Sequence, residues 1–328
     1  MVKVAVLDDY QDVALKMADW GALPDDAEVR VFRDHLSSVG DLVERLRDFE
    51  IVACMRERTP FQRDLLSQLP NLRLLVTTGL GNAAIDLDAA TGLGIVVCGT
   101  NGRGYPTAEL TWGLILALLR HIPREHAAIQ RGLWQTTVGE DLNGRTLGLL
   151  GLGRLGSRVA AVGLAFEMSV IAWSQNLTAD TAARHGAALV SRDELFARSD
   201  VLSVHLVLSD RTRGLVTARE LGLMKPTAFL INTSRGPIVE ETALVDALRS
   251  RSIAGAGLDV FDEEPLAPGH PLRDLDNVVL TPHIGYVSRA TYELFFEHTV
   301  QGIAAYLAGN PVRVLNPPVL PNARRLER

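Results

Sequence analysis

The chain has 328 residues, which exceeds the size at which a single hydrophobic core keeps growing, so we expect two domains. Hydrophobic residues make up 47% and charged residues 22%, as in ordinary globular proteins, which excludes disordered and low-complexity classes. The net charge of -6 provides no basic footprint for nucleic acid or anionic lipid, so we expect small-molecule partners, no nucleic acid and no membrane.

The N-terminal half begins with short apolar runs that alternate with segments of helical period. The predicted strands are residues 2–7, 29–32, 51–54, 74–77 and 95–98, and the segments 41–48 and 86–90 begin with acids suited to helix starts. This alternation predicts a parallel, doubly wound sheet. The first run is followed by acids and has neither a cationic lead nor a small-residue cleavage site, so we expect a strand rather than a signal peptide.

Two cysteines, Cys54 and Cys98, each end one of these apolar runs. A disulfide framework or a zinc site requires more ligands or closer spacing, so we expect no metal site. Two reduced thiols in the core are typical of a cytoplasmic protein. A loop rich in glycine and proline at residues 101–106 leads into a helix at 107–119, too short to span a bilayer, which we interpret as a crossover between domains.

A dinucleotide fingerprint lies near the middle of the chain, where the apolar run 146–150 leads into the glycine loop 151–156 (GLGRLG) and then a predicted helix. Gly151 permits a tight turn, Gly153 lets the backbone approach a pyrophosphate, and Gly156 lets the helix pack on the strand. The helix N-terminus then faces the anion. Nearly half of the chain precedes this loop, so the predicted cofactor domain is not the first in the sequence.

A second alternating block follows, and a long helix ends it. The predicted strands are 147–150, 170–173, 188–190, 201–206, 228–232, 254–258 and 278–280, which is enough for two mononucleotide-binding halves. Thr217 and Glu220 form a capping box at the start of one intervening helix. No strand follows Gly285, so we expect the helix 289–307 to return to the first domain.

Three polar residues come directly after predicted strands of the second block. Arg235 follows strand 228–232, Glu264 follows strand 254–258, and His283 follows strand 278–280. In an open α/β sheet, ligands bind beyond the carboxyl ends of the strands. Each of the three has Pro or Gly within two residues, which ends the run and turns the side chain toward the crevice.

These residue types suit the reduction of a 2-oxo acid by hydride. The carbonyl oxygen needs a proton, and His is the side chain that titrates closest to neutral pH. A carboxylate such as Glu264 would favour the imidazolium form of His283 and fix its tautomer. A guanidinium such as that of Arg235 can hold the substrate carboxylate in a two-pronged bond and polarise the carbonyl.

The ordered motifs GLGRLG, NTSRG, DVFDEEP and TPHIG resemble those of the D-isomer-specific 2-hydroxyacid dehydrogenases, which include glycerate, glyoxylate and phosphoglycerate dehydrogenases. The resemblance covers essentially the whole chain. It implies an NAD(P)-binding Rossmann domain at residues 104–286, inserted in a flavodoxin-like substrate-binding (catalytic) domain made of 1–103 and 287–328. It also implies a homodimer and hydride transfer between NAD(P)H and a small 2-oxo acid or D-2-hydroxy acid.

The resemblance assigns roles to individual positions. Arg235, Glu264 and His283 are the expected catalytic residues, and Asp259 matches the acid that approaches the nicotinamide. The expected cofactor-binding residues are Gly151, Gly153, Arg154, Leu155, Gly156, Ser174, Thr233, Asp259 and Thr107. The expected substrate-binding residues are Leu80 and Gly81, in a loop whose amides bind the carboxylate, together with Arg56 and Arg235. The alternation Arg56-Glu57-Arg58 is also typical of a solvated charge run.

The chain departs from the family pattern at two positions. Val207 stands where the family usually has Pro, on the adenine side. Ser174 stands where NAD-specific members place an acid that bonds the ribose hydroxyls and repels a 2′-phosphate. No Arg follows to hold a phosphate, so the sequence predicts NAD or NADP without selecting either.

Two other functions share features of this sequence. Proteins that resemble this family also serve as NAD-sensing corepressors, which can retain the catalytic trio, so this alternative stays open. Short-chain dehydrogenases share the glycine loop but need a Tyr-x-x-x-Lys pair, and none of the five tyrosines has Lys four residues later. Among the other histidines, His205 is expected in the core, and the remaining six are expected at the surface or in packing.

Overall fold

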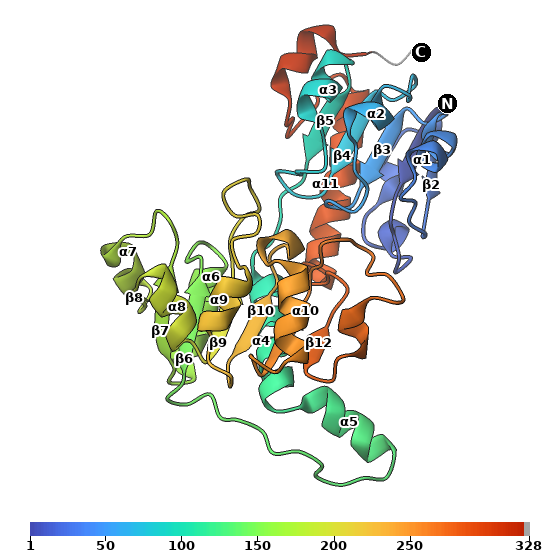
Figure 1. The fold of residues 1–328 in the computed structure, drawn as a ribbon. Coiled ribbons are helices and arrows are strands. Elements are labelled where there is room, and N and C mark those ends of the chain that lie inside the picture. The colour runs from blue at the N-terminus through green and yellow to red at the C-terminus, as the bar shows by residue number, and fades with distance from the viewer. Residues whose placement is uncertain (325–328) are drawn as a thin grey trace. The chain divides into compact units, whose positions relative to one another are not determined.

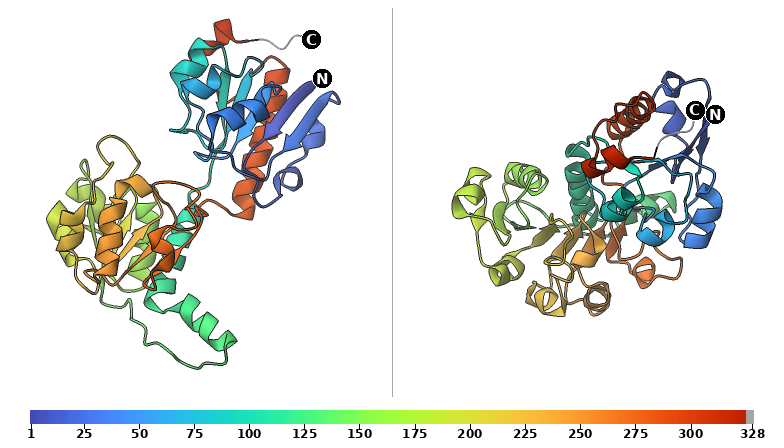
Figure 2. Two further views of the ribbon diagram at one scale, coloured as in Figure 1. Left: turned by 45° about the vertical axis from the view of Figure 1, so that its right-hand side comes forward. Right: turned by 90° about the horizontal axis from the view of Figure 1, so that it is seen from above.

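The chain folds into two compact units, seen in a computed structural model that describes residues 1–324 (Figures 1 and 2). One unit is formed by Met1–Arg103 together with the chain from Val287 onward, and the other by Gly104–Tyr286. Both ends of the chain therefore build one unit, and the middle of the chain builds the other. Within residues 1–324, no helix is both long enough and apolar enough to cross a bilayer.

The first unit contains a parallel sheet of five strands in the order β2-β1-β3-β4-β5. The strands are β1 (Val2–Val6), β2 (Ala27–Val31), β3 (Ile51–Cys54), β4 (Leu74–Thr77) and β5 (Val96–Gly99). This is the flavodoxin-like order, in which the strand order reverses between the first and third strands. The predicted doubly wound parallel sheet is confirmed.

Helices cover both faces of this sheet. One face packs against α1 (Val39–Leu46), α2 (Arg63–Leu66) and α3 (Leu87–Gly92). The other face packs against α11 (Arg289–Leu307) and the 3-10 turns η2 (Trp20–Ala22) and η5 (Pro317–Asn322), while η1 (Ala14–Lys16) follows β1. Because α11 lies against β4 and β5, the last long helix belongs to the same unit as the first strands.

The second unit contains a parallel sheet of seven strands in the order β12-β11-β10-β9-β6-β7-β8. The strands are β6 (Thr146–Leu150), β7 (Ser169–Trp173), β8 (Ala188–Leu189), β9 (Val201–Val204), β10 (Phe229–Asn232), β11 (Gly255–Leu258) and β12 (Val278–Leu280). This is the Rossmann order with one extra strand, and its order reverses between β6 and β9. The predicted Rossmann sheet is confirmed.

Two cores sandwich this sheet. One lies under α4 (Tyr105–Leu119), α6 (Gly156–Ala165) and α7 (Ala179–Arg184). The other lies under α8 (Arg192–Arg198), α9 (Ala218–Leu223) and α10 (Glu241–Arg249), with the 3-10 turns η3 (Gly236–Ile238) and η4 (Pro271–Asp274). Helix α5 (Ile122–Gln130) and the segment 131–141 extend from the body of this unit as an arm (Figure 1).

Element bounds differ from the predicted ones where local backbone bonding decides them. Strand β9 ends at Val204 rather than residue 206, and the N–H of His205 makes its last ladder bond, 2.8 Å to the carbonyl of Leu150. The helix expected at 41–48 instead begins at Val39, because the Ser38 hydroxyl caps it. Asp86, the acid that begins the predicted segment 86–90, is the N-cap of α3, and its side chain accepts from the N–H of Ala89.

Candidate active site

The glycine loop connects β6 to α6 with the geometry that its spacing predicts. Gly151 has a φ of +105°, a left-handed backbone that favours glycine. A Cβ at Gly156 would overlap the carbonyl oxygen of Gly151, so only glycine lets the helix approach the strand this closely. The loop lies where the strand order reverses, the place at which open α/β sheets bind ligands.

The residues of this loop fit a dinucleotide. Apart from its two chain neighbours, no atom of residues 1–324 lies within 4 Å of where a Cβ of Gly153 would stand, so the backbone is open at that position. Helix α6 begins at Gly156, and its N-cap residue Leu155 makes no side-chain cap bond, so this helix N-terminus is open to an anion. Arg154 is exposed and lies against Gly104, at the start of α4. A pyrophosphate is the kind of group that suits this combination.

His283 and Glu264 are joined by a hydrogen bond. The Nδ1 of His283 lies 2.6 Å from the Oε2 of Glu264, and both side chains are largely buried. The other carboxylate oxygen of Glu264 accepts from the N–H of Phe261 at 3.0 Å. With Nδ1 facing a carboxylate, Nε2 is the nitrogen left for a substrate. The ring of Tyr286 meets that of His283 edge-on, with centroids 5.6 Å apart.

Asp259 holds the loop that carries His283. Its Oδ1 accepts from the Thr281 hydroxyl at 2.6 Å and from the N–H of Ile284 at 2.8 Å, and its Oδ2 accepts from the N–H of Gly285 at 2.8 Å. Burial raises the pKa of Asp259 above its usual range, and these hydrogen bonds oppose that rise. His283 itself has a φ of +53°, so the clamp stabilises an uncommon backbone conformation.

Arg235 stands at the end of β10, in a turn organised by Asn232. The buried side chain of Asn232 accepts from the N–H of Ser234 and donates to the carbonyl of Arg235, each at 3.0 Å. A Cβ at Gly236 would overlap the backbone of Phe261. The turn that carries Arg235 is therefore packed directly on the loop that carries Glu264.

Two expected cofactor residues use their hydroxyls inside the protein. Thr233 bonds to Thr111 at 2.9 Å, and Thr111 donates to the carbonyl of Thr107 at 2.8 Å. The Thr107 hydroxyl in turn donates to the carbonyl of Gly285 at 2.9 Å. This chain links α4 and the end of β10 to the His283 loop.

The end of β7 is neutral, as the sequence shows. Ser174 is half-buried, and the next two residues, Gln175 and Asn176, are exposed. The carbonyl of Ser174 accepts from the N–H of Leu177 at 3.1 Å, which turns the chain. The nearest acid along the chain is Asp180, in the first turn of α7.

In the first unit, the loop after β4 presents backbone N–H groups. The N–H of Gly79 donates to the Thr100 hydroxyl at 2.8 Å and is therefore used. The structure gives the N–H groups of Leu80 and Gly81 no bond within residues 1–324, and the Leu80 side chain is 62% exposed. These two amides suit a carboxylate.

The charge run that includes Arg56 is not a solvated face, so that interpretation is wrong. The Arg56 side chain is only 23% exposed, donates to the carbonyl of Thr78 and lies 3.6 Å from the Glu57 carboxylate. Its guanidinium stands where a Cβ of Gly79 would be. Arg56 therefore packs against the Leu80 and Gly81 loop, because these turns follow the neighbouring strands β3 and β4.

Comparison with known proteins identifies the family. The model of the D-isomer specific 2-hydroxyacid dehydrogenase NAD-binding domain matches residues 112–285, more than half of the chain. The chain belongs to the D-isomer-specific 2-hydroxyacid dehydrogenase family. It is therefore an NAD(P)-dependent oxidoreductase, and the glycine loop described above lies within the matched domain.

Relatives extend over most of the chain. The glyoxylate reductase of Aeropyrum pernix is 43% identical over 264 residues, 77% of this chain and 79% of that protein. The D-3-phosphoglycerate dehydrogenase of Methanocaldococcus jannaschii is 34% identical over 97% of this chain, but the chain spans only 60% of that longer protein.

Solved structures agree with both units. A phosphoglycerate oxidoreductase of Vibrio cholerae matches with a TM-score of 0.90 and 38% identity, over 94% of this chain and all of that one. The D-lactate dehydrogenase of Aquifex aeolicus, complexed with NAD and lactic acid, matches with a TM-score of 0.77 and 28% identity over 98% of each chain. All four names are those of enzymes, so the comparisons give the corepressor alternative no support.

The structure also shows polar contacts that sequence reasoning missed. His270, expected at the surface or in packing, bonds to Glu241 at 2.9 Å near the Glu264 loop. Neither residue lies in a recognisable motif. The one available signal was position, because His270 precedes Pro271 at the start of a turn.

Proposed function

We propose that the enzyme reduces a small 2-oxo acid to the D-2-hydroxy acid, and catalyses the reverse oxidation, with His283 as general acid and base. The single observation that carries the proposal is the 2.6 Å bond between Glu264 and His283. That bond orients the imidazole and leaves its Nε2 for the proton transfer. The bound dinucleotide supplies or accepts the hydride.

The geometry of the His283 imidazole determines which nitrogen transfers the proton. In reduction, Nε2–H of His283 gives its proton to the carbonyl oxygen, which becomes the hydroxyl of the product. In oxidation, neutral Nε2 takes that proton back. Glu264 keeps its carboxylate on Nδ1 throughout, stabilising the positive ring and preventing it from rotating.

Arg235 is the proposed anchor of the substrate carboxylate. A guanidinium at this position can bond both carboxylate oxygens and polarise the adjacent carbonyl. The packing of Gly236 on Phe261 supports this role, because it couples the Arg235 turn to the Glu264 loop. In the first unit, the N–H groups of Leu80 and Gly81 and the side chain of Arg56 are the proposed substrate contacts.

The proposed dinucleotide contacts are the glycine loop, Thr107, Ser174, Thr233 and Asp259. Ser174 neither repels a 2′-phosphate nor bonds the ribose as strongly as an acid would. We therefore propose that the enzyme accepts both NADH and NADPH. Glyoxylate and hydroxypyruvate are suitable first substrates, because a relative is named glyoxylate reductase and both are short 2-oxo acids.

The test is the oxidation of NADH and of NADPH over a panel of 2-oxo acids, monitored at steady state. We expect turnover with at least one short 2-oxo acid, and a loss of roughly 100-fold or more in kcat for His283→Ala, since general acid–base catalysis contributes on that scale. Absence of turnover with every acid, or full turnover in His283→Ala, would sink the proposal. His185→Ala, an exposed histidine of the same unit, is the control and is expected to behave as wild type.

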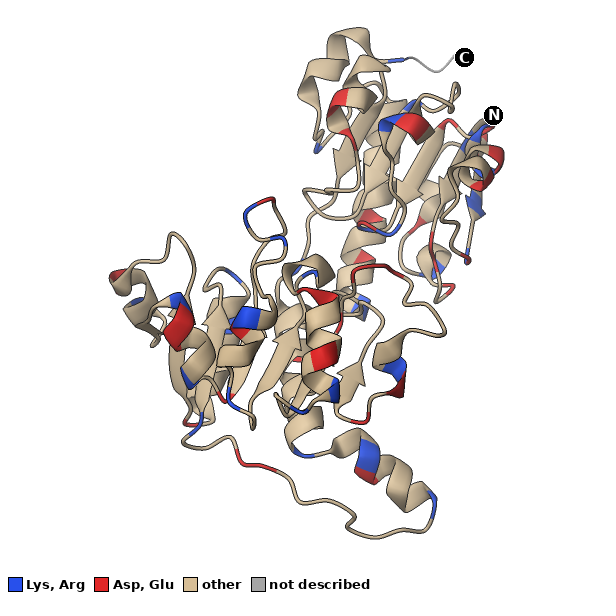
Figure 3. Cartoon of the chain, viewed as in Figure 1, with Lys and Arg blue, Asp and Glu red and all other residues tan. Residues whose placement is uncertain are grey.

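We also propose a cytoplasmic homodimer that does not bind nucleic acid. Both cysteines are buried free thiols, which suits a reducing compartment. Lys and Arg are interspersed with Asp and Glu within each unit instead of forming a basic stripe (Figure 3). The arm formed by α5 and residues 131–141 exposes apolar side chains, as a surface for a second copy would.

A further inference from the structure

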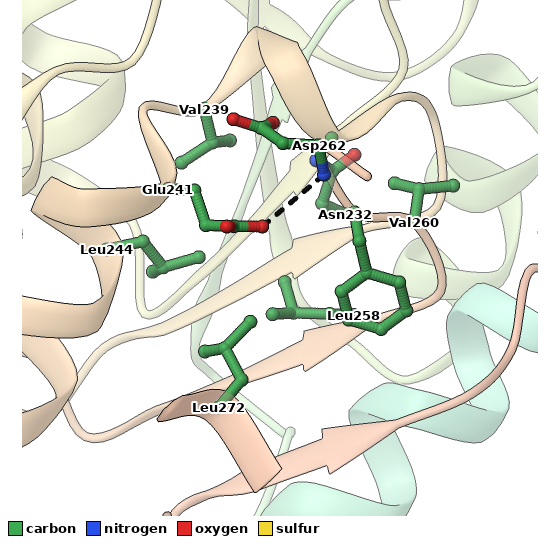
Figure 4. A pocket seen from close by; sticks show the side chains of 10 residues that line it. Asn232, Val239, Glu241, Leu244, Leu258, Val260, Asp262 and Leu272 are labelled. Carbon is green, nitrogen blue, oxygen red and sulfur yellow. Dashed lines mark hydrogen bonds between the residues drawn. The ribbon is translucent and has the colours of Figure 1, made fainter. Parts of the chain in front are cut away.

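The loop that carries Glu264 is held on a second side by helix α10. Glu241, the first residue of α10, accepts from the backbone N–H of Asp262 through its Oε2 at 3.3 Å. Figure 4 shows the Glu241 carboxylate directed at that N–H within a small pocket. Most of its other lining residues are apolar, among them Val239, Leu244 and Leu258.

The second oxygen of Glu241 is held by His270. The Nδ1 of His270 accepts from the N–H of Leu272 at 3.3 Å, so the ring proton of the neutral form must sit on Nε2. Nε2 lies 2.9 Å from Oε1 of Glu241, and both side chains are largely buried. His270 therefore donates to Glu241 with a fixed tautomer, and both oxygens of the carboxylate are engaged.

These contacts continue to the catalytic pair. Asp262 is adjacent to Phe261, whose N–H donates to Oε1 of Glu264 at 3.0 Å. Oε2 of Glu264 is the atom bonded to His283. A displacement of the backbone at Asp262 would thus move the Phe261 N–H and, with it, the carboxylate that orients the imidazole.

The negative charges of Glu241 and Asp262 oppose each other across this contact. Burial, and then the charge of Glu241, raise the pKa of Asp262, while Arg213 and His270 lower it. The two acids therefore repel each other. The hydrogen bonds to the Asp262 N–H and to His270 are what keep Glu241 in place.

We infer that Glu241 and His270 are a positioning pair, which fixes the Glu264 loop and through it the orientation of His283. The inference rests on the proposed function, since it assigns the pair to that same acid–base reaction. Neither residue touches His283, so their effect is on the placement of Glu264. The pair is expected to influence kcat far more than the KM for the dinucleotide.

The test compares Glu241→Ala and Glu241→Gln with the matched control Glu240→Ala. Glu240 is adjacent, exposed, and makes no side-chain cap bond, so it offers the same charge change without the contacts. We expect Glu241→Ala to lower kcat by roughly 10-fold or more, since small misplacements of catalytic groups have such effects. Glu241→Gln should be intermediate, because the amide oxygen can still accept one of the two bonds.

His270→Asn separates positioning from local structure. His270 caps the turn η4 through Nδ1, and Asn is a good cap but too short to reach Glu241. We expect His270→Asn to lower kcat several-fold without lowering the Tm.

A readout independent of turnover distinguishes failure of this inference from failure of the proposed function. Proton and ¹⁵N NMR of histidine-labelled protein reports the proton between His283 and Glu264, assigned by its loss in His283→Ala. We expect this signal to shift or broaden in Glu241→Ala and His270→Asn and to stay unchanged in Glu240→Ala. An unchanged signal in Glu241→Ala and Glu241→Gln, or a kcat for both within two-fold of that of Glu240→Ala, would overturn the inference.

Discussion

Desolvation of the imidazole ring determines the charge state of His205 in the second unit. Its side chain lies at the end of β9 beside Gly156, and its Nε2 is 2.9 Å from the Ser203 hydroxyl. Desolvation lowers the pKa of His205 to about 4. The ring is therefore neutral wherever the enzyme is folded near neutral pH, so it supports the glycine loop by packing and not by charge.

This depressed pKa makes stability depend on pH in a defined window. Between about pH 6.5 and pH 4, the unfolded chain binds a proton at His205 and the folded chain does not, so stability falls as pH falls. The contribution is about 1.4 kcal/mol for each pH unit. We expect His205→Gln to show a smaller decrease in Tm from pH 6.5 to pH 4.5 than wild type, measured by thermal melting.

The comparison with a surface histidine isolates the effect. His185 is exposed in the same unit, so His185→Gln should follow the wild-type pH dependence. Burial raises the pKa of Asp259, so above the ordinary pKa of an aspartate this group makes stability rise as the pH falls, the opposite of the His205 effect. Asp259 is present in wild type, His205→Gln and His185→Gln alike, so it does not affect the comparison. Identical slopes for His205→Gln and wild type would contradict the prediction.

Local sequence patterns indicate the candidate catalytic residues better than they indicate the residues that position them. The positions of Arg235, Glu264 and His283 beyond strand ends could be predicted, because each follows an apolar run and has Pro or Gly within two residues. Their catalytic roles stay predictions. The 2.6 Å pairing of the last two was implied by chemistry. The contact of Glu241 with His270 depends on residues 29 positions apart that meet through tertiary packing, and no local pattern encodes it.

Within the glycine loop between β6 and α6, two glycines are needed for different reasons. Gly156 is required by the protein itself, since a Cβ there would overlap the carbonyl oxygen of Gly151. A Cβ at Gly153 would meet no atom within 4 Å among the described residues, its chain neighbours aside. The glycine at 153 is therefore free of any demand from the fold, and its backbone is open to a ligand.

The pair Gly153→Ala and Gly156→Ala tests this division. Gly153→Ala is expected to leave the Tm of the free protein within about 1 °C of wild type while raising the KM for NADH, because a methyl group would occupy the approach to the pyrophosphate. Gly156→Ala should lower the Tm by several degrees as well, since overpacking costs about 1–3 kcal/mol. Melting curves without cofactor and steady-state kinetics check both.

A matched substitution completes the design. Gly222 lies in α9 and also meets no protein atom within 4 Å, so Gly222→Ala should leave the KM for NADH unchanged. The division of tasks would be wrong if Gly153→Ala were as unstable as Gly156→Ala. It would also be wrong if Gly153→Ala bound NADH as tightly as wild type.

Strands were predictable and short connecting elements were not. Most strands of the two sheets are apolar runs, and β3, β4, β5, β9, β10 and β11 are buried on two faces, so composition alone marks them. Helix α5 begins at Ile122, and its N-cap residue His121 has a left-handed φ of +51°, two residues after α4 ends at Leu119. Its mean hydropathy is low, so no apolar run marks it in the sequence.

For the molecule as a whole, the order of the strands explains the late position of the glycine loop. Both sheets are parallel, so their strands need helical connections and each unit takes up a long stretch of chain. Because the second unit is inserted into the first, its glycine loop comes only after the N-terminal segment of the first unit. The chain returns to the first unit at Val287, where α11 covers a face that the N-terminal strands leave open. The insertion was predictable from the motif's offset.

The arm of the second unit is the remaining feature that a single chain does not account for. The arm exposes Trp134 by 76% and Val138 by 91%, and Leu133 and Ile129 by about half. The arm bonds mainly to itself, through Glu125 to the hydroxyls of Thr136 and Thr137. Apolar side chains this exposed on an extended segment suit a symmetric contact with a second copy.

We therefore expect Trp134→Ser and Val138→Lys to shift the protein from dimer toward monomer. Sedimentation equilibrium should give the wild type twice the single-chain mass of 35.6 kDa and the variants a lower average, because each change removes apolar area from the contact. Leu15→Ser, a residue of the first unit that is 54% exposed, is the control and should remain dimeric. A wild type that sediments as a single chain at micromolar concentration, or variants that stay fully dimeric, would show that the arm is not the interface, because the contact proposed for it depends on these side chains.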